Sequence, residues 1–162
     1  MEFEIFEKYS YFGLFLILLI EESGIPIPIP GDLFIAATAA LPDSNYLFIV
    51  TTVTISTLVG STILFSLSKN FGYKLLLKYG KRIKFTPEKI KRIQKWFEKY
   101  GMWAIVIGRL IPGLRTVTPF TAGLFNLTYK KFWVSTLLAA LIWANVYYLI
   151  GRFFNQIIEV LN

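Results

Sequence analysis

Two long stretches without a charged residue, 45–68 and 132–151, constrain most strongly how this chain can fold. An α-helix rises about 1.5 Å per residue, so about twenty apolar residues cross the roughly 30 Å of hydrocarbon in a bilayer. We therefore predict transmembrane helices over 45–68 and 132–152. Hydrophobic residues make up 55% of the 162 positions, more than a soluble domain of this size usually carries. The expected class is a single all-α integral membrane domain, multi-pass in the cytoplasmic membrane of the cell.

A third apolar stretch precedes these two, and we predict a first membrane helix over residues 9–22. It is short for a full span and follows an acidic start, MEFEIFEK. A secretory signal begins with a basic region and ends in a small-residue cleavage site, which this segment lacks. We therefore expect the first helix to remain in the mature protein.

The basic charge of the chain is concentrated in residues 69–99. This segment holds eleven Lys or Arg and two Glu, a net charge of +9, whereas the whole chain carries +7. Basic loops between membrane spans face the cytoplasm, which orients the helix before it. Nucleic-acid binding is the rival interpretation of such a patch. The flanking membrane spans disfavour it, and no nucleic-acid partner is expected.

Part of the basic loop carries a helical pattern. Thr86 and Pro87 form a typical helix start, with a capping hydroxyl before a proline in the first helical position. Apolar residues then recur at helical spacing, with Lys and Arg between them: Ile90, Ile93, Phe97 and Tyr100. This pattern is typical of an amphipathic helix that lies on a membrane surface.

Residues 101–127 are apolar but interrupted. Pro112 lacks a backbone donor and Gly113 is free to turn, so a continuous helix is disfavoured at this point. Each arm reaches only about the middle of a bilayer. Lys130 and Lys131 also favour the cytoplasmic side, so the segment must begin and end there. We predict a re-entrant helical hairpin over 101–127.

The same design occurs once earlier in the chain. Residues 29–31 and 111–113 both read Ile-Pro-Gly, and a charge follows each: Asp32 in one and Arg115 in the other. Small residues, a turn and one transmembrane helix come next in both cases. We predict a first re-entrant hairpin over 23–41, broken at Pro28, Pro30 and Gly31, which enters from the opposite side. A hairpin plus a span, repeated in opposite orientation, is the inverted-repeat plan of secondary transporters.

Five ionisable residues lie near the two breaks: Glu21, Glu22, Asp32, Arg109 and Arg115. Each charge placed at the bilayer centre costs roughly 2.5–3.5 kcal/mol, so we expect these groups to be paired or hydrated. Irregular backbone at this depth is tolerated where it lines a polar cavity, which favours a site at the hairpin tips. A purely structural pairing of carboxylates with arginines is the alternative.

The chain contains no His and no Cys. This composition excludes disulfides, a catalytic thiol, a Ser-His-Asp triad and the common Cys/His metal sites. No calcium-loop or phosphate-loop spacing is present either. We expect no metal, no cofactor and no enzymatic activity.

In these residues the chain resembles the DedA family, a branch of the SNARE-associated Golgi protein (VTT domain) superfamily. The resemblance covers about residues 10–152. It is carried by an acidic residue with a proline-rich box, the KWFEKYG end of the basic loop, the GRLIPGLRT box and a tail. The residues of the two boxes and the tail are Glu21 or Glu22, Pro28, Pro30, Gly31, Asp32, Gly108, Arg109, Pro112, Gly113, Arg115, Thr116, Ala122, Gly123, Tyr129, Lys130, Lys131, Phe132 and Trp143. Asp32 stands where many members have Glu. The chain also lacks the extra terminal helices of many members, which makes a homo-oligomer a possible state.

The resemblance implies a lipid transporter or flippase, acting on undecaprenyl phosphate or a phospholipid and dependent on the proton motive force. It implies that the functional charges are Glu21 or Glu22, Asp32, Arg109 and Arg115. Our hypothesis is that Arg109 and Arg115 bind the lipid phosphate, while the carboxylates carry protons and pair with the arginines when the site is empty. Glu21 is the slightly favoured glutamate. The alternatives are a membrane enzyme acting on lipid phosphates and a non-transporting factor in envelope homeostasis.

Overall fold

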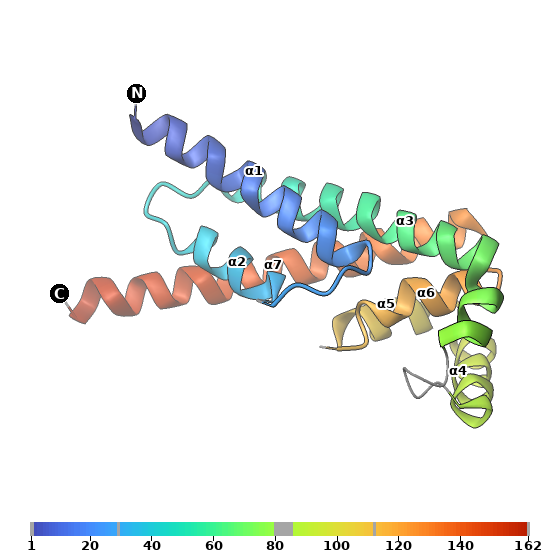
Figure 1. The fold of residues 1–162 in the computed structure, drawn as a ribbon. Coiled ribbons are helices and arrows are strands. Elements are labelled where there is room, and N and C mark those ends of the chain that lie inside the picture. The colour runs from blue at the N-terminus through green and yellow to red at the C-terminus, as the bar shows by residue number, and fades with distance from the viewer. Residues whose placement is uncertain (1, 29, 80–85, 112, 162) are drawn as a thin grey trace. The chain divides into compact units, whose positions relative to one another are not determined.

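A computed structural model describes residues 2–28, 30–79, 86–111 and 113–161 of the chain (Figure 1). Every regular element within these ranges is an α-helix, which confirms the predicted all-α class. In chain order the helices are α1 (Glu2–Glu22), α2 (Gly31–Ala39), α3 (Tyr46–Tyr79), α4 (Pro87–Tyr100), α5 (Met102–Leu110), α6 (Val117–Leu124) and α7 (Tyr129–Leu161).

Two of these helices are long and apolar enough to cross a membrane. The membrane-competent parts are Tyr46–Gly72 of α3 and Tyr129–Ile157 of α7. Each part contains nearly all of one uncharged stretch of the sequence. Both helices extend beyond these membrane-competent parts. α3 has 34 residues and α7 has 33.

Internal contacts divide the chain into two compact units. Unit 1 contains residues 1–60 and 140–162, and unit 2 contains residues 61–139. The boundary falls inside α3 and inside α7, so each long helix contributes one part to each unit.

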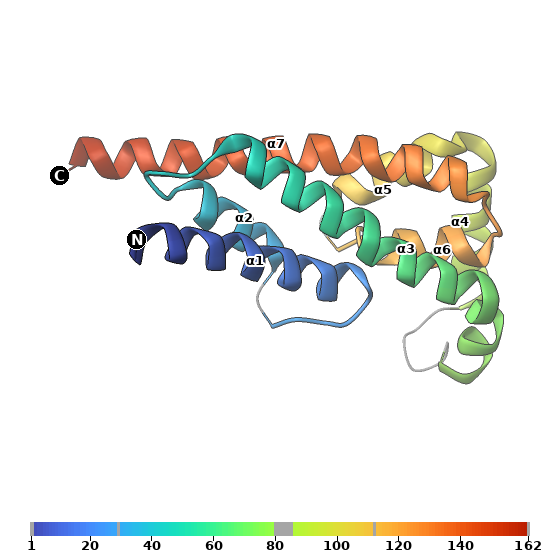
Figure 2. The ribbon, with the colours of Figure 1, turned by 90° about the horizontal axis from the view of Figure 1, so that it is seen from above.

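Unit 1 contains a helix–loop–helix pair, α1 and α2, which are in contact with each other (Figure 2). Between them residues 23 and 24 form a turn, and the other described residues up to Pro30 have no regular secondary structure. Prolines occur at positions 26, 28 and 30, and a proline pushes the residue before it out of the helical region and removes a backbone donor. The predicted first hairpin, 23–41, thus has one helical arm, α2, in its second half. The arm before the break belongs to α1, which begins at Glu2 and not at the predicted residue 9.

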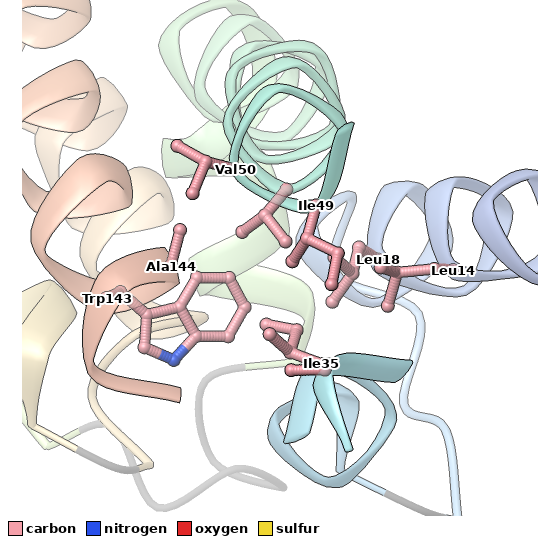
Figure 3. Packing of buried hydrophobic residues seen from close by; sticks show 9 residues of the cluster. Leu14, Leu18, Ile35, Ile49, Val50, Trp143 and Ala144 are labelled. Atoms are coloured by element: carbon pink, nitrogen blue, oxygen red, sulfur yellow. The ribbon is translucent and has the colours of Figure 1, made fainter. Parts of the chain in front are cut away.

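The core of unit 1 is an apolar cluster to which all four of its helical segments contribute. Figure 3 shows side chains of α1, α2, α3 and α7 packed in one cluster, with the indole of Trp143 on one side of it. The buried members are Leu14, Leu18, Ile35, Ala39, Ile49, Val50, Val53, Trp143 and Ala144. Burial of this surface ties the short helix α2 to the two long helices.

The core of unit 2 has a second cluster, built around two stacked rings. The ring centroids of Phe65 and Phe132 lie 4.2 Å apart. The other buried members come from α4, α5 and α6: Phe97, Ala104, Ile105 and Ala122. Within this unit α5 contacts both α4 and α6.

α4 begins where the sequence predicts. The Thr86 hydroxyl accepts a hydrogen bond from the backbone N–H of Lys89 at 3.4 Å, and Pro87 follows the cap. The backbone N–H of Glu88, aided by the Thr86 hydroxyl, lowers the pKa of the Glu88 carboxyl. The apolar side of α4 packs into the core of unit 2 through Phe97, Ile93 and Trp96. Protein therefore covers part of the face that the amphipathic pattern assigns to a membrane surface, whereas Tyr100 on the same face is exposed.

We expect Gly123→Leu to destabilise the protein by about 1–3 kcal/mol, as overpacking of a close contact does. A Cβ atom at Gly123 would collide with the backbone O of Phe65 in α3 and would lie 2.9 Å from the backbone N of Lys69. Neither backbone atom can move without shifting α3. Thermal unfolding in detergent measures the loss. Gly13→Leu is the matched control, because a Cβ at Gly13 meets no atom within 4 Å; an equal loss in both variants would contradict the packing argument.

Candidate functional site

Glu21 holds the start of α2. Its Oε2 accepts a hydrogen bond from the backbone N–H of Gly31, the first residue of that helix, at 3.0 Å. The cap residue before it, Pro30, offers no side-chain acceptor. A carboxylate at a helix N-terminus satisfies an orphan N–H and complements the helix dipole. A Cβ at Gly31 would overlap this carboxylate, which explains why glycine follows the proline break.

Glu22 faces a different neighbour and is fully buried, with 0% of its surface exposed. It lies where α1 passes close to α3 at Gly60. A Cβ at Gly60 would lie 2.8 Å from the Cβ of Glu22 and 2.6 Å from the carbonyl O of Leu19. Consecutive helical residues point about 100° apart, so one glutamate serves α2 and the next faces α3.

Asp32 lies in the first turn of α2 and binds the indole of Trp143 in α7. Trp143 Nε1 donates to Asp32 Oδ1 at 2.8 Å, and only 6% of the Trp143 surface is exposed. The ring of Tyr147 lies edge-on to the indole, with 6.0 Å between centroids. The sequence identified Trp143 as part of a motif but did not reveal this partner, 111 positions away.

Arg109 and Arg115 lie on either side of the turn that joins α5 to α6. Arg109 occupies the last turn of α5 and is 3% exposed, while Arg115 precedes α6 and is 7% exposed. Gly113, in the turn between them, has a φ of 81°, a conformation that glycine adopts without strain. Unit 2 thus buries both predicted arginines in one helix–turn–helix pair.

Close packing positions this pair of helices. A Cβ at Gly108 would lie 2.7 Å from the Thr118 hydroxyl of α6 and 3.4 Å from the indole of Trp96 in α4. Only glycine lets α5 approach both neighbours at this point. The residue after it is Arg109, so the packing fixes where that guanidinium leaves the helix.

The N-terminus of α6 differs from that of α2. Its cap residue, Thr116, makes no side-chain hydrogen bond to the first turn. In α2 the chain supplies a carboxylate for this purpose, whereas the residue two positions before α6 is the cation Arg115. The Thr118 N–H in the first turn donates to the carbonyl O of Leu114 at 2.9 Å, so the attraction for an anion here comes from the helix dipole and from the nearby cation.

The remaining predicted site residues lie where the helices break. Pro28 and Pro30 belong to the non-helical segment before α2, and Pro30 has extended backbone angles, φ −60° and ψ 135°. Pro112 lies outside the described residues. Pairing of the carboxylates with the arginines would join residues of unit 1 to residues of unit 2, and it stays a prediction.

Comparison with known proteins identifies the relatives of the chain. The VTT domain model matches residues 29–153. Undecaprenyl phosphate transporter A of Staphylococcus aureus is 30% identical, with 92% of this chain and 76% of that protein covered. Protein DedA of Escherichia coli is 31% identical, covering 92% and 70%. The uncharacterized membrane protein YbfM of Bacillus subtilis is 27% identical, covering 92% and 93%.

No solved structure matches the chain significantly. The family match nevertheless covers Pro30 and Gly31 of the first break, the second break, the basic helix α4, both arginines and most of α7. These are the features from which the site is built. The chain belongs to the VTT domain family, together with DedA.

Proposed function

We propose that this protein moves a phosphate-headed lipid across the cytoplasmic membrane, and that Arg109 and Arg115 bind the phosphate. The observation that carries the proposal is the burial of both arginines on either side of the turn that joins α5 to α6. A guanidinium is a planar fork that matches phosphate oxygens, and it keeps its charge when buried. The lipid tail would stay in the bilayer while the head passes through the protein.

The family supports membrane lipid transport as the class of function. One relative is named as a transporter of undecaprenyl phosphate. An anionic phosphate is the part that this lipid shares with phospholipids, and it is the part that arginines recognise. We therefore propose undecaprenyl phosphate or a phospholipid as the substrate.

Transport would depend on two re-entrant hairpins. The helices α2, α5 and α6 have nine, nine and eight residues. At about 1.5 Å per residue, none of them can cross a hydrocarbon layer of about 30 Å. Each hairpin break lies next to charged residues, as expected where irregular backbone lines a polar path.

A repeated aromatic contact supports an inverted repeat. Tyr46 opens α3, and its ring lies 5.0 Å from that of Tyr148 in α7. Tyr129 opens α7, and its ring lies 5.0 Å from that of Phe65 in α3. Both pairs are edge-to-face. Tyr129 lies 83 positions after Tyr46, and Tyr148 lies 83 positions after Phe65. Each pair lies within one unit.

A repeated close approach gives the same spacing. In unit 1, Gly151 of α7 packs against Ala39 of α2. In unit 2, Ser68 of α3 packs against Gly123 of α6, and its hydroxyl donates to the carbonyl of Phe120 at 2.5 Å. Ser68 and Gly151 stand 83 positions apart and Ala39 and Gly123 stand 84 apart, so the two spacings agree to within one residue. We infer that the halves arose as copies, which the cytoplasmic placement of the basic loop would orient oppositely.

The proposal is tested by reconstitution into proteoliposomes with head-group-labelled lipids. We expect the purified protein to accelerate translocation of labelled undecaprenyl phosphate or a labelled phospholipid at least tenfold over protein-free liposomes. Parallel assays with both lipids identify the substrate. If no lipid is translocated, the proposal is wrong and the protein is a non-transporting factor. If inorganic phosphate is released, the protein is an enzyme and not a transporter.

We further propose that protons drive transport through Glu22 and Asp32. A buried carboxylate at membrane depth is costly when charged, so protonation changes its interactions strongly. Collapse of an imposed pH gradient with an ionophore is therefore expected to slow translocation several-fold. The control is an ionophore that collapses only the electrical potential. Equal rates with and without the pH gradient would mean a passive scramblase.

A further inference from the structure

The side of α4 that faces away from the core of unit 2 carries a row of cations. Lys91, Lys95 and Lys99 are spaced one helical turn apart, and Arg92 lies beside them on the same face. All four side chains are exposed. We name these four residues the basic face of α4.

The basic face keeps like charges close together. Lys91 and Lys95, and Lys95 and Lys99, are four residues apart, a spacing at which like charges repel and weaken a helix. Glu98, the carboxylate nearest Lys99 in the sequence, accepts a hydrogen bond from Gln94 at 2.9 Å. A surface that retains this repulsion is suited to an anionic partner.

Aromatic residues mark the level of this face relative to a bilayer. Tyr100 ends α4 with 40% of its surface exposed, and Trp103, in the first turn of α5, is 63% exposed. The Nζ atom of Lys99 lies 5.1 Å from the centre of the Tyr100 ring. Exposed Trp and Tyr beside Lys are typical of the headgroup region of a membrane.

We propose that the basic face of α4 binds the headgroups of anionic phospholipids in the membrane that holds the protein. Because Phe97, Ile93 and Trp96 already pack in unit 2, the helix would bind by charge and would not insert an apolar face. α5, which carries Arg109, begins two residues after α4 ends. The basic face would concentrate phosphate-headed lipids next to the proposed transport site. This role rests on the proposed function, whereas the binding of anionic headgroups does not depend on it.

The test uses the full-length protein in a nonionic detergent with added phosphatidylglycerol, and bound lipids are counted by native mass spectrometry. We expect Lys91→Gln/Lys95→Gln to lower the affinity for phosphatidylglycerol about tenfold or more, as the loss of two surface cations predicts. Binding of phosphatidylcholine should not change. High salt should abolish the difference between the variant and the unmodified protein, because the interaction is electrostatic.

Two control variants test whether the effect depends on the positive charge of residues 91 and 95 and on their position in the basic face of α4. Lys91→Arg/Lys95→Arg keeps both charges and should retain the affinity. Lys130→Gln/Lys131→Gln removes two exposed cations at the start of α7 and should change the affinity less than twofold. An equal loss in the Lys130/Lys131 variant, or full affinity in the Lys91/Lys95 glutamine variant, would overturn the proposal. In an Arg109→Gln/Arg115→Gln background, which removes the proposed transport site, Lys91→Gln/Lys95→Gln should still lower the affinity about tenfold, which separates failure of the surface from failure of the transport site.

Discussion

Replacing Arg115 with glutamine is expected to reduce lipid translocation to the rate of protein-free liposomes. Arg115 is 7% exposed and lies two residues before α6, so its side chain is held inside the fold. Glutamine keeps a hydrogen-bonding side chain but loses the charge and the bidentate fork. A hydrogen bond to a charged group contributes about 1.5–3 kcal/mol, so losing two of them would weaken phosphate binding by two to four orders of magnitude. The reconstituted flipping assay measures the effect.

Arg109→Gln is expected to give the same result, because this side chain is buried at the other end of the turn. Arg115→Lys should retain part of the activity, since lysine keeps the charge without the fork. Arg152→Gln is the matched control. Arg152 is a partly exposed arginine near the end of α7 and should keep nearly full activity. Unmodified rates in both Arg109→Gln and Arg115→Gln would contradict the site.

The sequence predicted the membrane helices because their signal is local. A run of about twenty uncharged apolar residues has few alternatives to a spanning helix, and residues 46–68 and 132–151 of the two runs lie inside α3 and α7. The helix ends were less predictable, because both long helices continue into polar segments. Charge-free length identifies the part that is apolar enough to cross hydrocarbon, but it does not limit how far the helix extends beyond that part.

The helix α4 shows where periodicity stops being informative. Its cap at Thr86 and its end at Tyr100 agree with the sequence pattern. An apolar stripe looks the same whether lipid or protein covers it, because the pattern reports only that the stripe avoids water. Tertiary packing decides between them, and here Phe97 is covered by unit 2.

Two contacts of the candidate site could not be predicted from one sequence. The hydrogen bond between Asp32 and Trp143 joins residues 111 positions apart, and no local pattern identifies such a partner. The capping role of Glu21 depends on how α1 approaches Gly31 across the proline segment. The sequence located the charged residues because charge in a membrane is costly, but their individual partners depend on the fold.

Replacing Glu22 with glutamine is expected to abolish the dependence of translocation on a pH gradient. Glu22 is fully buried against α3, and glutamine has nearly the same shape, so the contact at Gly60 remains. The variant should remain folded, because an amide of nearly the same volume fills the same space. Translocation assays with and without an imposed gradient, combined with thermal unfolding, measure both effects.

Glu21→Gln is the comparison that separates the two neighbouring glutamates. Its amide oxygen can still accept the hydrogen bond from Gly31, so the start of α2 should survive with a loss of about 0.3–1 kcal/mol from the missing charge at the helix N-terminus. The response to a pH gradient should remain. If Glu21→Gln abolishes that response and Glu22→Gln preserves it, the proton carrier is the glutamate that caps α2, and burial at Gly60 serves only packing.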